Sequence, residues 1–167
     1  MGFIFQHSYL LKNLPIRDNI VLPGFKSGKL SREKVNQHVD ELMVKTGIDN
    51  VAKHDIKKVS GGQLQRAAIC RALINQPDIL FGDEPTGALN SSTSRDVMDI
   101  INTVNTEGTT VIIVTHDAKV AAWAGRVIFL MDGKIHDELT LGKYDGDEKK
   151  KPSREKRLSE WLEKQEF

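Results

Sequence analysis

The sequence is poor in cysteine and aromatic residues, and its two kinds of charge nearly cancel. It has 167 residues, of which 6% are aromatic, and its 24 Lys and Arg face 23 Asp and Glu, for a net charge of +1. The near balance argues against a strongly basic nucleic-acid binder, so we expect no nucleic-acid partner. The single cysteine, Cys70, excludes an intrachain disulfide. Its place in the apolar run AAICRAL predicts a buried structural thiol and favours a cytoplasmic location.

Long hydrophobic runs are also missing. No stretch of eighteen apolar residues exists, so we expect no membrane-spanning helix. The start MGFIFQHSYLL has no positively charged region or cleavage site, and Gln6 stands where a myristoylation motif needs Ser or Thr. With 39% apolar and 28% charged residues, the composition is that of a soluble globular domain.

A complete phosphate-binding loop is a further absence. Residues 23–31 read PGFKSGKLS, which is one residue short of G-x-x-x-x-G-K-[ST]. Leu30 follows Lys29, so no hydroxyl stands where Mg²⁺ needs one. We interpret this stretch as a polar turn or variable loop, and phosphate chemistry must be sought elsewhere.

Apolar runs and helical patterns alternate along the chain. Strands are expected at GFIF, DILFGD and TTVIIVTHD, and two more in RVIFLMDGKIHDEL, joined by a turn at residues 132–133. Helices are expected in residues 31–47, in residues 62–75, in SSTSRDVMDIINTVN and in AKVAAWAG. Such alternation predicts an α/β fold with a parallel sheet and flanking helices.

The C-terminal residues 143–167 differ in character. Residues 143–157 are dense in both charges, which predicts a solvated linker. The ending SREKRLSEWLEKQEF places Leu158, Trp161 and Leu162 on one helical face. We expect a terminal amphipathic helix docked on the domain; a helix that meets a membrane partner or a lipid surface is the alternative.

The stretch VSGGQLQR, residues 59–66, contains a capping box. Ser60 and Gln63 have the spacing at which each side chain bonds the other's backbone amide, so a helix should begin here. Gly61 and Gly62 leave the first-turn N–H groups open to an anion at the positive end of the helix dipole. A phosphate would fit, although the motif alone is also that of an ordinary capped helix.

Two further motifs follow expected strands. In ILFGDEP, Asp83 and Glu84 end a buried strand, where open α/β sheets bind ligands. Asp83 can hold Mg²⁺ through water, and Glu84 can polarise an attacking water. In VIIVTHD, His116 can donate a hydrogen bond to a phosphate or to that water. Each motif in isolation is also typical of an ordinary strand end.

The order of these motifs resembles the nucleotide-binding domain of ATP-binding cassette (ABC) transporters over nearly the whole chain. In family terms FIFQ holds the Q-loop glutamine Gln6, VSGGQ is the signature, ILFGDEP is Walker B, TGALN is the D-loop and THD is the H-loop. The run QRAAICRALINQPDILFGDEPTGALNSSTSRDVM resembles the branch that serves macrolide export, lipoprotein release and antimicrobial-peptide resistance. The ending RLSEWLEKQEF looks like the peptide-resistance members.

The resemblance implies a P-loop NTPase-like domain in residues 1–142, with a helical signature subdomain at about residues 10–75. It implies a dimeric ATPase that uses ATP and Mg²⁺, with a second ATP-binding subunit and a transmembrane permease as partners. Such a subunit is cytoplasmic, peripheral on the inner face of the cell membrane. It powers export or release of a peptide, a lipoprotein or a drug-like substrate.

The resemblance also assigns roles to residues. Glu84, His116 and Gln6 are expected to be catalytic, and Asp83 and Gln6 to hold Mg²⁺. The signature residues are expected to bind the γ-phosphate of the partner's ATP; they are Ser60, Gly61, Gly62 and Gln63. Asn90 of the D-loop is also expected to belong to the ATP-binding site.

The chain departs from the family in two respects. The N-terminal β-subdomain, the Walker A strand and the Walker A loop are absent. We therefore expect the chain alone to be inactive, and to expose sheet edge and apolar surface at a cost in solubility. Asn90 stands where the D-loop usually has Asp, which puts communication between the two sites in doubt.

Three interpretations remain. The first is the C-terminal part of a transporter ATPase subunit. The second is a natural non-hydrolytic module that lends a signature face to a complete subunit, or inhibits it. The third, a DNA-repair ATPase of the SMC kind, is disfavoured because the sequence has no coiled-coil heptads and no evident basic surface.

Overall fold

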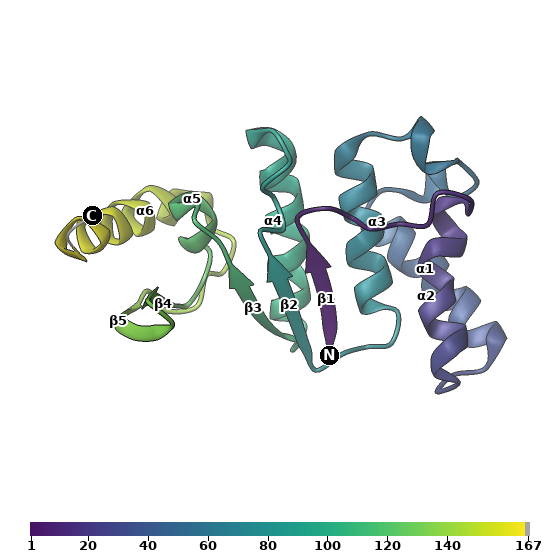
Figure 1. Cartoon of the computed structure of the whole chain (residues 1–167), viewed down its shortest axis with the longest axis horizontal. Coiled ribbons are helices and arrows are strands. Elements are labelled where there is room, and N and C mark those ends of the chain that lie inside the picture. Colours follow the sequence, from purple (N-terminus) through teal and green to yellow (C-terminus); the bar gives the residue numbers. More distant parts are fainter. Residues whose placement is uncertain (166–167) are drawn as a thin grey trace. The chain divides into compact units, whose positions relative to one another are not determined.

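The computed structural model describes residues 1–165 and forms two compact units (Figure 1). The first unit is Met1–Val114, and the second begins at Thr115. The first unit is an α/β structure with a parallel sheet, as the sequence predicts. The assignment of residues 1–142 to a single ATPase domain stays a prediction. Among the described residues, no helix combines the length and the apolar character needed to cross a membrane.

The sheet of the first unit has three parallel strands. β1 (Gly2–Phe5), β2 (Ile79–Asp83) and β3 (Thr110–Val114) pair in the order β1-β2-β3. Side chains alternate between the two faces, so Ile4 and Leu80 are buried on one face. On the other face Phe3 stacks on Phe81, and Phe3, Ile112 and Val114 are exposed. The sheet therefore has one covered and one open apolar face; the expected cost in solubility stays a prediction.

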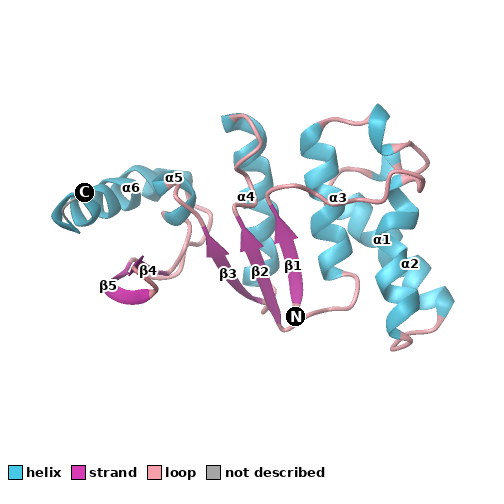
Figure 2. Cartoon of the chain, viewed as in Figure 1, coloured by secondary structure: helices cyan, strands magenta, loops and turns pink. Residues whose placement is uncertain are grey.

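Four helices belong to this unit (Figure 2). They are α1 (Ile16–Ser27), α2 (Arg32–Lys45), α3 (Gly61–Leu73) and α4 (Ser91–Thr106), with the short 3₁₀ helices η1 (Asp49–Val51) and η2 (Ile56–Lys58) between α2 and α3. The predicted helices in residues 31–47, 62–75 and 91–105 are confirmed. Their ends follow local chemistry: Ser31 caps α2, and Gly47 follows it with a φ of +67°.

α1 corrects the sequence interpretation of residues 23–31 as a turn or loop. Pro23 lies inside the helix, and the chain leaves the helix only at Gly28, whose φ is +64°. Proline inside a helix costs about 3 kcal/mol, which is why the pattern looked non-helical. Ile16 and Ile20 are fully buried, and Val21 is nearly so. Their burial outweighs the cost of Pro23.

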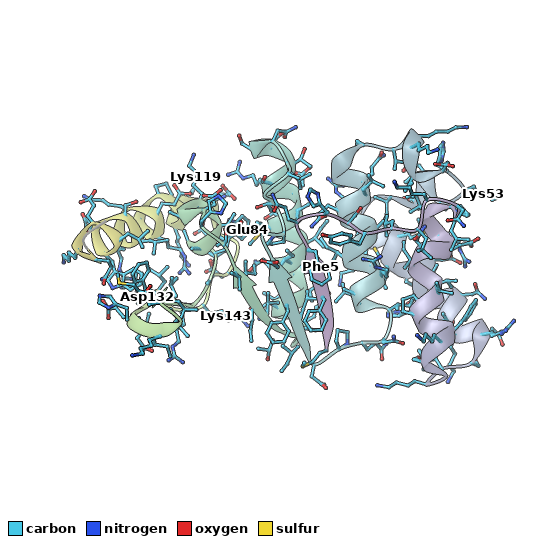
Figure 3. All side chains as sticks on the ribbon, viewed as in Figure 1. Phe5, Lys53, Glu84, Lys119, Asp132 and Lys143 are labelled. Atoms are coloured by element: carbon cyan, nitrogen blue, oxygen red, sulfur yellow. The ribbon has the colours of Figure 1, made fainter. Side chains whose placement is uncertain are left out.

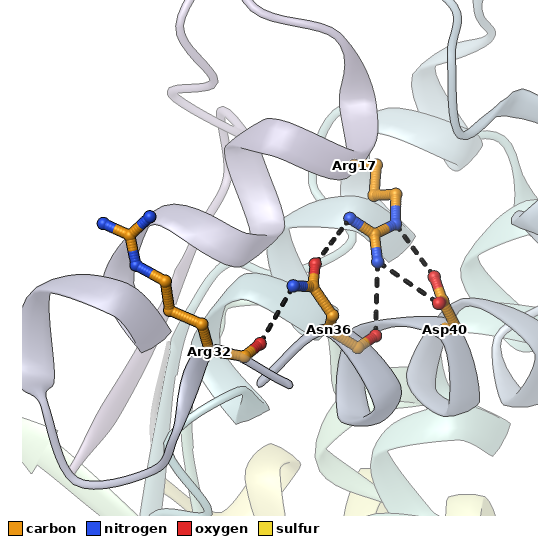
Figure 4. A network of polar contacts seen from close by, with 4 residues as sticks. All are labelled: Arg17, Arg32, Asn36 and Asp40. Carbon is orange, nitrogen blue, oxygen red and sulfur yellow. Dashed lines mark hydrogen bonds and ion pairs between the residues drawn. The ribbon is translucent and has the colours of Figure 1, made fainter. Parts of the chain in front are cut away.

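α1 and α2 are joined by a polar network (Figure 4). The Arg17 guanidinium donates to both carboxylate oxygens of Asp40, at 2.8 and 3.2 Å. It also donates to the side-chain oxygen of Asn36 at 3.0 Å, and Asn36 in turn donates to the carbonyl of Arg32. The two-pronged geometry orients the helices more than a single ion pair would.

Cys70 is buried, as predicted. Its sulfur lies 3.1 Å from the Thr46 hydroxyl oxygen. Burial raises the pKa of the thiol to about 11. Cys70 therefore stays a neutral packing residue at physiological pH.

The second unit contains an antiparallel hairpin and a helix. Its elements are α5 (Ala118–Ala121), β4 (Arg126–Met131), β5 (Lys134–Thr140), η3 (Glu148–Lys150), α6 (Lys151–Leu162) and η4 (Glu163–Gln165). The predicted turn is confirmed: Asp132 and Gly133 have φ of +50° and +74°, the left-handed values that a tight hairpin needs.

The predicted linker at residues 143–157 was wrong in its second half, because α6 begins at Lys151. Arg154 is buried and donates to three backbone carbonyls: Ala122 at 2.9 Å, Leu141 at 3.1 Å and Ala124 at 2.8 Å. A charge-dense sequence hides such a residue, since its bonds go to carbonyls distant in the chain. Arg154 thus fixes α6 to the loops around the hairpin.

The face predicted for the terminal helix is docked within the second unit. Leu158 is fully buried, and the Trp161 ring meets Phe129 edge to face. The Trp161 indole and the Gln165 amide each donate to Asp137 at 2.8 Å. The backbone N–H of Glu138 and these two donors lower the pKa of Asp137. The last two residues of the predicted helix, 166–167, lie outside the described residues.

The Arg154 contacts lead to a stability prediction. Arg154→Met should lower the unfolding free energy of the second unit by about 2–4 kcal/mol, because it leaves three carbonyls without their charged donor. Arg157→Met is the matched control, since exposed Arg157 donates to the Thr140 carbonyl alone among the residues that the structure describes. Urea unfolding followed by tryptophan fluorescence reports this unit alone, because Trp123 and Trp161 are the two tryptophans. Equal midpoints for both variants would contradict the role of Arg154.

Candidate functional site

The three parallel strands end at one level. Phe5, Asp83 and Val114 are register partners across β1, β2 and β3. Gln6 directly follows Phe5, and Glu84 directly follows Asp83, so these predicted site residues leave the same edge of the sheet. Figure 3 shows Glu84 and Phe5 at this edge. The carboxyl ends of parallel strands are where open α/β sheets bind ligands.

Glu84 has an unusual backbone. Its φ is +45°, in the left-handed region that costs a non-glycine residue roughly 1–2 kcal/mol. Its N–H donates to the Val114 carbonyl at 2.9 Å, and its carbonyl accepts from Gly87 at 3.0 Å. The side chain is half-buried, whereas that of Asp83 is exposed. The two neighbouring carboxylates therefore occupy different environments.

Gln6 lies against the turn that follows Glu84. A Cβ on Gly87 would stand 3.0 Å from the Gln6 side-chain nitrogen, so a larger residue at this position would displace the Gln6 side chain. The structure thus brings Gln6 to the turn of residues 84–87. Asp83 and Gln6 offer the hard oxygen atoms that Mg²⁺ prefers.

The capping box that opens α3 is present. The Ser60 hydroxyl accepts from the Gln63 amide at 3.3 Å, and the Gln63 side chain accepts from the Ser60 amide at 2.9 Å. Ser60 and Gly61 are exposed, and the first turn carries no acidic residue. The positive end of the helix dipole is therefore open to an anion.

Gly62 has a packing role that the sequence analysis missed. A Cβ at this position would stand 2.4 Å from the Thr93 methyl group, while one at Gly61 would make an ordinary 3.7 Å contact with Leu89. Gly62 lets the starts of α3 and α4 approach closely. Its assignment to phosphate binding stays a prediction beside this structural role.

Asn90 acts locally as the N-cap of α4. Its side-chain oxygen accepts from the Thr93 amide at 3.0 Å and from the Ser92 hydroxyl at 2.9 Å. Aspartate would cap a helix equally well, so the Asn90 departure leaves the cap intact. Its part in communication between two sites stays a prediction.

His116 is exposed and belongs to the second unit. It precedes Asp117, whose backbone amide donates to the Thr115 hydroxyl and whose side chain caps α5. A catalytic role for His116 at the edge of the first unit stays a prediction.

Gln65 is the residue that sequence reasoning missed. It is 4% exposed, and its amide nitrogen donates to the Phe5 carbonyl at 2.9 Å and to the Pro85 carbonyl at 2.7 Å. It shares a helical face with buried Ile69 and Leu73, at spacings of four residues. An amide on the buried face of a helix was the available signal, since buried polar groups need partners.

Fold and site together define the class. A parallel sheet that ends in carboxylates, beside a capped helix that can receive an anion, is the arrangement of an α/β nucleotide-binding domain. The ABC transporter family model matches residues 1–87 of the chain. The chain belongs to this family.

Relatives of known sequence support the assignment. The macrolide export ATP-binding/permease protein MacB of Pasteurella multocida (strain Pm70) is 40% identical over 134 residues, or 80% of this chain and 20% of that protein. The uncharacterised ABC transporter ATP-binding protein YknY of Bacillus subtilis (strain 168) is 38% identical over 135 residues, or 81% of this chain and 58% of that protein. The chain thus spans about a fifth of the MacB relatives and less than two thirds of YknY.

Solved structures give the same result. The ATP-binding cassette MJ0796, in a dimeric post-hydrolysis state bound to ADP and Pi, matches with a TM-score of 0.74 and 37% identity. The match covers 86% of this chain and 63% of that one. The fold is therefore that of an ABC cassette.

The glycine pair at the start of α3 yields a prediction. Gly62→Ala should destabilise the first unit by about 1–3 kcal/mol, because the new methyl group overlaps the Thr93 methyl group at the α3–α4 contact. Gly61→Ala, whose methyl group would make only an ordinary contact with Leu89, should change stability by less than about 1 kcal/mol. Urea unfolding followed by far-ultraviolet circular dichroism measures both. The packing role of Gly62 is refuted if the two variants unfold alike.

Proposed function

We propose that this chain forms part of the ATP-binding and ATP-hydrolysing subunit of an ABC transporter. The main support is the strand register: β1, β2 and β3 end side by side, so Gln6, Asp83 and Glu84 lie at the same edge of the sheet. The subunit would sit on the cytoplasmic face of a membrane through a partner permease. The named function of the MacB relatives, macrolide export, supports export of a drug-like molecule. Export or release of a peptide or a lipoprotein rests on the sequence resemblance alone.

The site chemistry fits ATP with Mg²⁺. Among the described residues, no cluster of three or more His, Cys, Asp and Glu side chains could hold a metal ion alone. Asp83 and the Gln6 amide oxygen would thus supply one or two ligands, with water and phosphate oxygens as the rest, which is the usual mode of Mg²⁺. Bound ATP–Mg²⁺ supplies the transferable phosphoryl group and neutralises its charge.

Glu84 would accept the proton of the attacking water. Its carboxylate is half-buried, and its backbone is fixed by the bonds to Val114 and Gly87. A positioned carboxylate of this kind acts as a general base. Gln6, which lies against the same turn, would orient the water, and His116 would donate a hydrogen bond to it or to a phosphate.

The start of α3 would bind a second subunit's nucleotide. The first turn formed by Ser60, Gly61, Gly62 and Gln63 would face a γ-phosphate across a dimer interface. The Gly61 and Gly62 N–H groups would be the donors, since the Ser60 and Gln63 amides form the capping box. The dimeric state in which MJ0796 was solved supports this arrangement. Closure of the dimer would then depend on ATP.

A carboxylate substitution tests the hydrolytic role. In the subunit as its gene encodes it, Glu84→Gln should lower ATP turnover by about 100-fold or more, because the amide cannot accept the proton. Nucleotide binding should persist, and gel filtration should show a dimer that ATP stabilises. Glu107→Gln at the exposed end of α4 is the matched control. Unchanged turnover in Glu84→Gln would refute the role of this carboxylate.

The second candidate is a non-hydrolytic module that would lend the capped start of α3 to the nucleotide of a complete subunit. In that case the chain alone is inactive and acts through a partner's loop. Purified chain, added in about tenfold excess to a complete cassette of the family, should raise or block its ATP hydrolysis. Ser60→Arg, which fills the anion site, should remove the effect. No change in hydrolysis would exclude this candidate.

A further inference from the structure

One buried amide joins three parts of the first unit. The Gln65 side chain has two N–H donors and uses one for the Phe5 carbonyl and one for the Pro85 carbonyl. Phe5 directly precedes Gln6, and Pro85 directly follows Glu84. A single side chain of α3 therefore holds the backbone next to both residues that the proposed function places at the attacking water.

A second side chain of α3 binds the backbone that follows Gln6. The Arg71 guanidinium donates to the carbonyls of Ser8 and Tyr9, each at 2.7 Å. Tyr9 has a φ of +45°, so the segment after Gln6 takes a conformation that needs support. Gln65 and Arg71 together fix the chain on either side of Gln6 to one rigid helix.

The proposed anion site lies at the N-terminus of the same helix, α3. Ser60 caps the helix, and Gln65 lies one turn beyond Gly61. A displacement of the first turn therefore moves Gln65 with it, since helix backbone bonds make these residues a rigid unit.

We propose that Gln65 is a positioning residue that transmits the position of the α3 N-terminus to Gln6 and Glu84. The proposal rests on the proposed function, in which that N-terminus receives a phosphate. Binding at Ser60 and Gly61 then sets the geometry of the hydrolytic residues through the two Gln65 hydrogen bonds. Loss of the bonds leaves phosphate binding intact and impairs the chemical step.

Gln65→Met tests the proposal in the subunit as its gene encodes it. Methionine keeps the length and the packing of glutamine but has no donor. We expect kcat for ATP hydrolysis to fall about tenfold or more while KM for ATP changes less than about threefold. Hydrogen exchange at the Glu84 and Gly87 amides, followed by NMR without nucleotide, should become about tenfold faster as the turn loses its tie to α3.

Gln37→Met is the matched control. Gln37 is an exposed helical glutamine whose amide donates to Glu41 on the same helix, so its loss should change neither kcat nor the two amides. Gln65→Glu is the second test variant, because a carboxyl group keeps the shape and donates at most one hydrogen bond, in its protonated form. It should also lower kcat.

The outcomes separate the two proposals. A lower kcat with KM retained and faster exchange supports the positioning role; unchanged kcat overturns it. A proportional change of kcat and KM with a lower melting temperature indicates only structural support and also overturns it. If the unsubstituted subunit hydrolyses no ATP, the proposed function fails. Hydrogen exchange at the Glu84 and Gly87 amides then decides alone whether Gln65 fixes the turn of residues 84–87. Faster exchange in Gln65→Met supports this role, and unchanged exchange refutes it.

Discussion

The register of three parallel strands is the constraint on which the candidate site depends. Phe5, Asp83 and Val114 are level because Ile4 and Leu80 are buried on one face. A slip of one residue would turn these side chains to the open face and shift the strand ends. Core packing therefore determines where the carboxylates lie. The Glu84 amide extends the pairing by one bond, to the Val114 carbonyl.

Buried and half-buried polar side chains hold the irregular segment between β1 and α1. Gln65 and Arg71 bind its first part, and Asn19, which is 2% exposed, binds its second part. The Asn19 amide donates to the carbonyls of Leu11, Leu14 and Pro15, and its oxygen accepts from the Leu11 amide. These bonds give partners to part-buried backbone groups of the segment. The segment that carries Gln6 is thus fixed by helices rather than by a sheet.

The features that sequence could predict are local. The alternation of apolar runs gave the three strands and α2, α3 and α4, and the three-residue spacing of Ser60 and Gln63 gave the cap of α3. Two errors came from local signals that distant contacts outweigh. Pro23 suggested a break where Ile16 and Ile20 are buried, and the charges before residue 157 hid the buried Arg154.

The links within the site are not local, which explains why the sequence did not reveal them. Gln65 binds partners 60 and 20 residues away, and the spacing of these contacts follows from the packing of α3 on the sheet. No periodicity encodes such a distance. A polar residue on a buried helical face can indicate that a partner exists, but only the fold identifies the carbonyls of Phe5 and Pro85.

Glu84 shows how these constraints act together. Its left-handed backbone is locally unfavourable, and a strand that simply ended after Asp83 would not need it. Three bonds oppose the strain: the Glu84 amide to Val114, the Gly87 amide to Glu84, and Gln65 to the Pro85 carbonyl. The backbone therefore turns directly after Asp83, so that one carboxylate is exposed and the next is half-buried. Two neighbouring acids in the sequence thereby come to lie in different surroundings, which suits the two separate roles proposed for them.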